Sequence, residues 1–271
     1  MEDRAGTGMT PPPSRIQRIL ASDFLFDFRR APLAMLAASI VAFLFLVALL
    51  APLVAPTNPF DPASLNLMNG FTPPMTANMF TGESFVMGTD DQGRDLISAI
   101  IYGLRVSLFV GVMSVLLAMG LGVSLGLLAG YVGGWIDNLI MRVADIQLTF
   151  PSILIAMLIF GVMRGIIPPD LRDEMAIFVL ITAIGLSEWV PFARTVRATT
   201  LVEKEKEYVQ AARLIGLRRT QIMWRHILPN VIGPVLVIAT ITLALAVIPH
   251  AALPYDALDP RPTGPCRGLP L

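Results

Sequence analysis

The sequence predicts an all-α membrane protein, a bundle of five transmembrane helices, and two observations lead to this fold class. Hydrophobic residues make up 55% of the 271 positions and charged residues only 15%, against about 25% charged residues in an average soluble domain. In addition, the stretches 31–60, 106–136 and 227–248 contain no charged residue at all. Because about 20 apolar residues cross the hydrocarbon core of a bilayer, each of these stretches is long enough to span it.

The composition also excludes several other classes of protein. Lys plus Arg equals Asp plus Glu at 20 each, so the chain lacks the basic excess of a nucleic-acid-binding protein. The single cysteine, Cys266, excludes an internal disulfide and a CxxC metal site. His226 and His250 have no second ligand at metal-binding spacing, and no Gly-Lys pair forms a phosphate-binding loop. We therefore expect no catalytic residue, no metal, no cofactor and no ATP hydrolysis by this chain itself.

The first transmembrane helix is expected within the apolar run 33–54, after an arginine-containing N-terminal segment, 1–30. The apolar core of a cleaved signal peptide is shorter and ends at a small-residue cleavage site, so this helix should remain uncleaved. The stretch 55–105 that follows is rich in Pro, Asn, Thr and Gly. It is too polar to lie in lipid, and we expect it to form a large external loop.

The second helix is expected over 106–130. Small residues recur in it at every fourth position, and because this spacing places them in one stripe, they allow the backbone of a neighbouring helix to approach closely. These predicted helix-packing residues are Ser114, Ala118, Gly122, Gly126 and Gly130.

The remaining three helices complete a predicted transmembrane domain over 31–248. The third is expected over 138–163 with a kink at Pro151, and Arg142 and Asp145 are spaced to pair on one of its faces. The fourth is expected to begin at Met175 and to continue through Glu188 to Pro191. The fifth is expected over 227–248.

The distribution of basic residues predicts the orientation, because cytoplasmic segments carry an excess of Lys and Arg. The N-terminal segment, Arg142 and the segment 193–226 together carry fourteen Lys and Arg residues, whereas the loops on the opposite side carry four. The N-terminus and the segment 193–226 are therefore expected in the cytoplasm.

A short amphipathic helix is predicted inside this cytoplasmic segment, with Gly216 at its end. Glu203 and Lys206 are spaced to pair, and four apolar residues lie at i, i+3, i+4 and i+7. Such a helix either rests on the lipid surface or docks in a groove of a partner, and its central alanines favour the partner because lipid-bound helices carry bulkier apolar residues. The expected contact residues are Glu207, Tyr208, Gln210, Ala211, Ala212, Ile215 and Gly216.

This segment resembles the coupling motif of ABC importer permeases. The motif is carried by Gln210-Ala211-Ala212, by Gly216 four positions on, and by Ile227-Leu228-Pro229, with Gln210 in place of the usual Glu and His226 in place of the usual Ile. The segments 88–95 and 101–108, together with Gly130-Tyr131 and Phe150-Pro151-Ser152, resemble the dipeptide, oligopeptide and nickel subfamily.

The resemblance implies a type I importer permease in the bacterial inner membrane, which imports peptides or a related small solute such as nickel. It also implies the partners: two cytoplasmic ATPase subunits, a second homologous permease and an external substrate-binding protein. The short helix would then seat in a groove of an ATPase subunit and couple its motion to substrate translocation.

The segment 249–271 departs from the resemblance, because it contains six prolines and no apolar span where the family has a sixth helix. A non-transporting membrane subunit therefore stays open as an alternative interpretation. A secondary transporter is a further alternative, although neither internal repeats nor midplane charges are evident.

Overall fold

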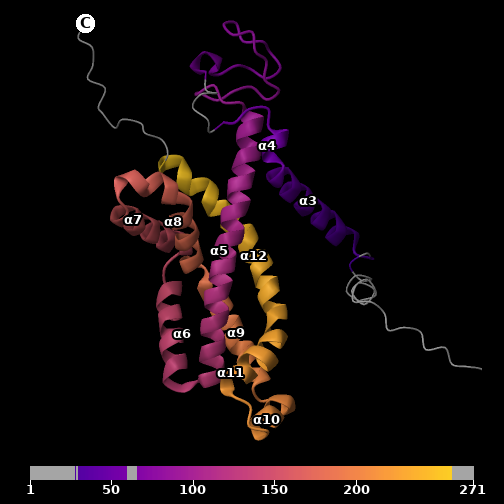
Figure 1. Cartoon of the computed structure of the whole chain (residues 1–271), viewed down its shortest axis with the longest axis vertical. Helices are drawn as coiled ribbons and strands as arrows, with labels where there is room; N and C mark the ends of the chain where they lie inside the picture. Colours follow the sequence, from indigo (N-terminus) through magenta and orange to yellow (C-terminus); the bar gives the residue numbers. More distant parts are fainter. Residues whose placement is uncertain (1–27, 29, 60–65, 258–271) are drawn as a thin grey trace, which may run out of the picture. The chain divides into compact units, whose positions relative to one another are not determined.

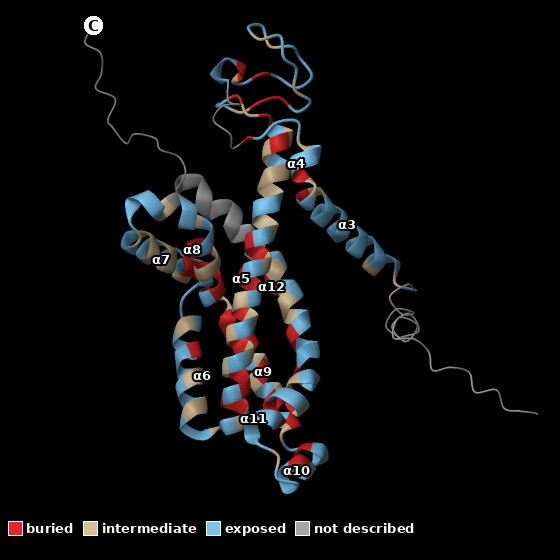
Figure 2. Ribbon diagram, viewed as in Figure 1, coloured by how far each residue is buried: buried red, intermediate tan, exposed pale blue. Residues whose placement is uncertain are grey.

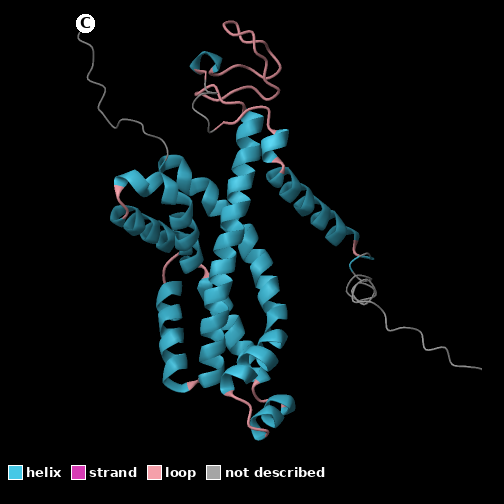
Figure 3. Ribbon diagram, viewed as in Figure 1, coloured by secondary structure: helices cyan, strands magenta, loops and turns pink. Residues whose placement is uncertain are grey.

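The computed structural model describes residues 28, 30–59 and 66–257. Over this part of the chain the secondary structure is helical, with two isolated β-bridges but no strand (Figure 3). The predicted all-α fold class is thus confirmed. The chain divides into two compact units, residues 1–105 and 106–271, and each is described by itself.

The first unit begins with a helix whose side chains are almost all exposed. Helix α3 (Pro32–Leu49) has Pro in its first turn, where the missing N–H costs nothing, and α4 (Ala51–Val54) follows it directly. Figure 2 shows most of α3 in the colour of exposed residues, and Ala48 is the single buried residue of the helix. The 18 residues of α3 extend about 27 Å at a helical rise of about 1.5 Å per residue, which is close to the thickness of a bilayer core. An apolar surface of this kind suits contact with lipid.

A hydrogen-bonded loop region occupies residues 66–95 and contains the 3-10 turn η2 (Leu67–Asn69) near its start. The backbone N–H of Thr72 donates to Oγ1 of Thr89 at 2.9 Å, and Oγ1 of Thr72 donates to the carbonyl of Asn69 at 2.7 Å. Gly88 has φ +79°, and a Cβ there would collide with the Thr72 carbonyl oxygen. The loop is therefore held in one conformation by polar contacts rather than by an apolar core.

Helix α5 (Leu96–Val132) begins ten residues before the start expected at position 106. The reason is an N-cap, because Oδ2 of Asp95 accepts hydrogen bonds from the backbone N–H of Ser98 at 2.9 Å and from its hydroxyl at 2.6 Å. The charge of Arg105 interrupts the apolar run but does not interrupt the helix. Residues 96–105, assigned to the loop from sequence, are thus helical.

The second unit contains the remainder of α5 and the other helices, shown in Figure 1. Helix α7 packs along α8, and α9 packs against α12 and α6. The bounds are α6 Gly134–Leu148, α7 Ser152–Ile166, η3 Pro169–Leu171, α8 Arg172–Ser187, α9 Trp189–Glu203, α10 Glu207–Leu214, α11 Arg219–Ile222, the π-helical turn η4 Met223–Ile227 and α12 Leu228–Ala257.

Two of the predicted spans are broken rather than continuous. The chain turns by 97° between α6 and α7, at Pro151, where a kink was expected, and by 41° between α8 and α9, at Glu188. Proline cannot supply the N–H that would continue the α6 hydrogen-bond ladder. The described helices include three that are long and apolar enough to cross a membrane, or five spans if each bent pair counts as one.

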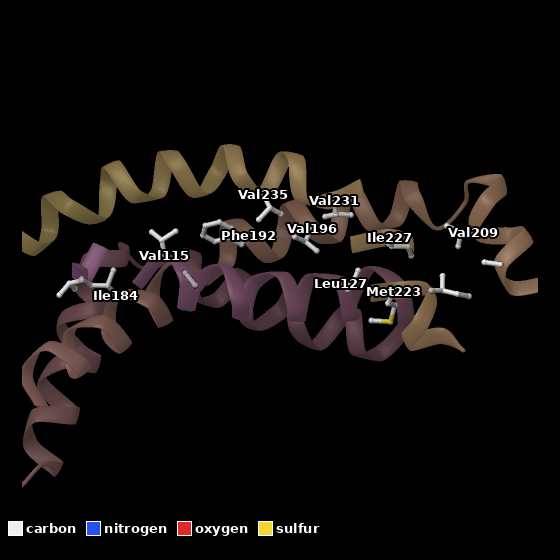
Figure 4. Close-up of a cluster of buried hydrophobic side chains, with 14 of the residues drawn as sticks. Val115, Leu127, Ile184, Phe192, Val196, Val209, Met223, Ile227, Val231 and Val235 are labelled. Carbon is white, nitrogen blue, oxygen red and sulfur yellow. The ribbon is translucent and has the colours of Figure 1, made fainter. Parts of the chain in front are cut away.

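The core of the second unit is a cluster of apolar side chains between α5, α9 and α12, continued by α8, α10 and η4. Figure 4 shows these side chains converging between the helices. The fully buried members of this cluster include Val110, Leu127, Phe192, Val196, Val209, Ile227 and Val231. The α10 segment is thus joined to the helix bundle through a shared apolar core.

Helix α12 ends at Ala257, nine residues beyond the predicted end at position 248. The expected proline-rich tail therefore begins as helix, and residues 258–271 lie outside the described residues.

Candidate coupling site

The short helix predicted from the amphipathic pattern is present as α10, and it follows α9 after a three-residue turn. Val209 and Ala212, three residues apart, are its two buried side chains, and both belong to the apolar cluster of the bundle. Residues at this spacing lie on one face of a helix. This face anchors α10 to its own chain.

The opposite face of α10 carries apolar side chains that the chain does not cover. Ala211 is exposed, and Leu214 and Ile215 are 88% and 75% exposed. The expected single stripe of Tyr208, Ala211, Ala212 and Ile215 is thus divided, because Ala212 faces the core while the others do not. Neither Val209 nor Leu214 was singled out from sequence, since the assumed stripe was centred on the alanines.

The two polar contact residues predicted on α10 lie near its beginning. Glu207 and Gln210 are exposed, and Nε2 of Gln210 donates to the carbonyl of Glu205 at 2.9 Å. Glu207 lies in the first turn, where a negative charge interacts favourably with the helix dipole. Gln210 thus stabilises the turn that precedes α10.

Gly216 ends α10 in a Schellman motif. Its N–H donates to the carbonyl of Arg213 at 3.1 Å, and the N–H of Leu217 donates to the carbonyl of Ala212 at 3.2 Å. Gly216 has φ +82°, a conformation that side-chain-bearing residues rarely adopt, although a Cβ there would meet no atom within 4 Å. The backbone conformation, rather than lack of space, therefore calls for glycine.

A buried carboxylate lies where α9 meets α10. The Glu203 side chain is 8% exposed, and the nitrogen of Lys206 lies 2.7 Å from its Oε1, which confirms the pairing predicted from their spacing. The hydroxyl of Tyr208 donates to Oε2 of Glu203 at 2.7 Å. Burial, reinforced by this hydrogen bond, raises the pKa of the Tyr208 phenol above its ordinary value, so the hydroxyl keeps its proton.

The end of α5 also contacts this region. Nζ of Lys204 donates to the carbonyl of Gly130 at 3.2 Å, in the last turn of α5, where a cation interacts favourably with the helix dipole. The guanidinium carbon of Arg213 lies 5.5 Å from the centre of the Tyr131 ring, a cation–π distance. The turn before α10 and the helix itself are thereby tied to α5.

All five small residues of the α5 stripe are in packed positions, and its three glycines lie against α9. Ser114 and Ala118 are buried, and each of the three glycines lies so close to α9 that an added Cβ could not fit without movement. A Cβ at Gly122 would lie 2.6 Å from the Trp189 carbonyl oxygen, and one at Gly130 would lie 2.7 Å from the Thr200 Cβ. We call this contact of α5 with α9 the glycine seam.

Two ion pairs connect α6 to α9, and neither was predicted. Arg197 binds Asp137 through two hydrogen bonds, one of them 2.6 Å long, and Arg194 pairs with Asp145. Asp145 was expected to pair with Arg142 on its own helix, but its partner lies 49 positions along the chain. No local spacing signals such pairs, because the folding of α9 onto α6 creates them.

Gln147 supports the break between α8 and α9. Its Nε2 donates to the carbonyls of Leu186 and Ser187 at 3.1 and 2.9 Å, and its Oε1 accepts from Nε1 of Trp189 at 2.8 Å. Carbonyls freed at a helix end in a membrane need such partners, because lipid supplies none.

The fold and this site together define a class: a multi-pass membrane bundle with a short amphipathic helix anchored on one face and uncovered on the other. Residues 122–255 match the family described as binding-protein-dependent transport system inner membrane component, and residues 20–74 match the N-terminal TM domain of oligopeptide transport permease C. The chain belongs to this family of permeases of binding-protein-dependent ABC importers.

Several proteins are similar to the chain over most of its length. The oligopeptide transport system permease protein OppC of Bacillus subtilis is 32% identical over 239 residues, which are 88% of this chain and 72% of that protein. The glutathione transport system permease protein GsiD of Shigella sonnei is 36% identical over 92% of this chain and 76% of its own length. The dipeptide transport system permease protein DppC of Alkalihalophilus pseudofirmus is 34% identical, with coverages of 92% and 78%.

Proposed function

We propose that this chain is the membrane permease of an ATP-driven importer of peptides in the bacterial inner membrane, with its N-terminus and α10 in the cytoplasm. The peptide substrate is supported by the similar proteins, since the oligopeptide, dipeptide and glutathione systems all transport short peptides. The orientation is supported by the fourteen-to-four distribution of basic residues.

The observation that carries the proposal is the uncovered face of α10. A segment that lies in water rarely leaves apolar side chains such as Leu214 and Ile215 exposed without a binding role, and α10 is expected in the cytoplasm. An amphipathic helix of this kind fits a hydrophobic groove of a partner. The chain has no phosphate-binding loop of its own, so we infer that the partners are two ATPase subunits.

The same complex requires two further partners. A binding-protein-dependent system uses an external substrate-binding protein, and we infer that a second homologous permease completes the pathway. The exposed apolar surfaces of α7 and α8, with Leu158 and Phe178 among them, offer area for contact with this permease or with lipid.

The test is co-purification of the ATPase subunits with the full chain and ATP-dependent uptake of a dipeptide and a pentapeptide into proteoliposomes. Leu214→Asp should abolish ATPase association, because a buried unpaired carboxylate is costly in an apolar groove. Met79→Asp is the matched control, since Met79 is 98% exposed on the loop expected outside. A chain that purifies alone and transports peptides without ATP would be a secondary transporter instead.

A further inference from the structure

The orientation of α10 against the helix bundle depends on the contacts that attach it. The helix has eight residues and follows α9 across a three-residue turn, and its apolar anchor consists of Val209 and Ala212 alone. A helix held only by an apolar contact can tilt about it, because such contacts have no preferred direction. A directional contact is needed to fix the orientation of α10 against the bundle.

Tyr208 makes directional contacts to two other helices. Its hydroxyl donates to Oε2 of Glu203, the last residue of α9, at 2.7 Å. The same oxygen accepts a hydrogen bond from Nδ2 of Asn230, in the first turn of α12, at 3.0 Å. One hydroxyl group thus joins the end of α9, the start of α10 and the start of α12.

The partners of this hydroxyl are themselves held in place. The other carboxylate oxygen of Glu203 is paired with Lys206, so both oxygens of the buried acid are used. Asn230 also donates to the carbonyl of His226 at 2.8 Å. His226 lies in the π-helical turn η4, which joins α11 to α12, and π-helical turns occur frequently at functional sites.

We propose that the Tyr208 hydroxyl is a clamp that orients α10 rigidly against α9 and α12, so that a displacement of α10 by the ATPase subunits moves both helices together. This proposal rests on the proposed function and names a positioning residue within it. Without the hydroxyl, α10 stays attached through Val209 and Ala212 and through the contact of Arg213 with the Tyr131 ring, but it tilts, and part of its displacement no longer reaches the bundle.

The variant that tests the clamp is Tyr208→Phe, which keeps the ring and removes every hydrogen bond of the hydroxyl, including a longer one of 3.4 Å to the His226 carbonyl. Its matched control is Tyr131→Phe, because the ring beneath Arg213 is retained and the Tyr131 hydroxyl makes no hydrogen bond to the described residues. In proteoliposomes Tyr208→Phe should keep ATPase association and hydrolysis but lower peptide uptake per ATP about tenfold, the size expected for a lost charge-assisted hydrogen bond.

A second measurement reports orientation directly, in the full chain without ATPase subunits. Spin labels at Leu214→Cys on α10 and Ile232→Cys on α12, both exposed positions, are introduced with Cys266→Ser. Tyr208→Phe should broaden the distribution of distances between the labels, whereas Tyr131→Phe should leave it narrow. An unchanged distribution, or unchanged uptake per ATP, would overturn the clamp.

The combined variant Tyr208→Phe with Asn230→Ala tests the shared oxygen. Because both changes break the same contact, the loss of uptake per ATP should be smaller than the product of the two single losses. Independent effects would contradict a single clamp. Absence of ATP-driven uptake by the unsubstituted complex would instead overturn the proposed function, so the two failures are distinguishable.

Discussion

Gly216 shows how one residue can be required for its backbone conformation alone. Its position at the end of α10 follows from the sequence pattern, but the reason for glycine does not. The open space around it rules out a steric role, and its φ of +82° points to the left-handed conformation of a Schellman motif. Burial also separates Ala211 from Ala212, neighbours whose roles the sequence pattern treats as equal.

Substitutions of Gly216 should therefore follow conformational preference rather than size. Gly216→Ala should destabilise the end of α10 by about 1 kcal/mol and lower peptide uptake per ATP in the assembled complex. Gly216→Asn should retain most of the uptake although Asn is larger, since Asn tolerates the left-handed region. A loss with Asn as large as the loss with Ala, or larger, would contradict the conformational explanation.

At the scale of elements, the glycine seam between α5 and α9 is the contact most directly encoded in the sequence. Its period of four residues places Gly122, Gly126 and Gly130 on one face, and the structure supplies the helix that lies there. The breaks at Pro151 and Glu188 are less visible in the sequence. A proline signals an interruption but not its angle of 97°, and Glu188 carries no local signal for a helix end.

Two alanine substitutions on α5 should have effects of opposite sign. Gly126→Ala should destabilise the protein by about 1–3 kcal/mol, because its Cβ would lie 2.9 Å from the Val196 Cβ in a packed contact. Gly120→Ala should stabilise the helix by up to about 1 kcal/mol, since Gly120 is exposed with no atom near an added Cβ. Thermal unfolding in detergent measures both, and destabilisation by both variants would contradict the assignment of the seam.

At the scale of the whole molecule, the number of candidate spans follows from length and composition, and the described residues contain three helices long and apolar enough to cross a membrane, or five if each bent pair counts as one span. The orientation of these spans is a separate prediction, because it depends on basic residues in loops and not on the helices themselves.

Site-directed labelling tests this orientation. In a Cys266→Ser background, Ser84→Cys should react with a membrane-impermeant maleimide in intact cells, and Thr220→Cys should react only after the cytoplasmic side is opened. Both positions are exposed in the structure, so accessibility of the side chain is not limiting. Reaction of both cysteines in intact cells would reject the predicted topology.

The sequence by itself determined the class of fold, the short helix ending at Gly216 and the small-residue face of α5. These features depend on residues that are close along the chain or repeat with the helical period. The tertiary structure alone decided that Ala212 is an anchor and that Asp145 pairs with Arg194. It also decided that Glu203, Tyr208 and Asn230 share one hydrogen-bond network. Such contacts join helices distant in sequence, and no local periodicity can specify which face of one helix meets another.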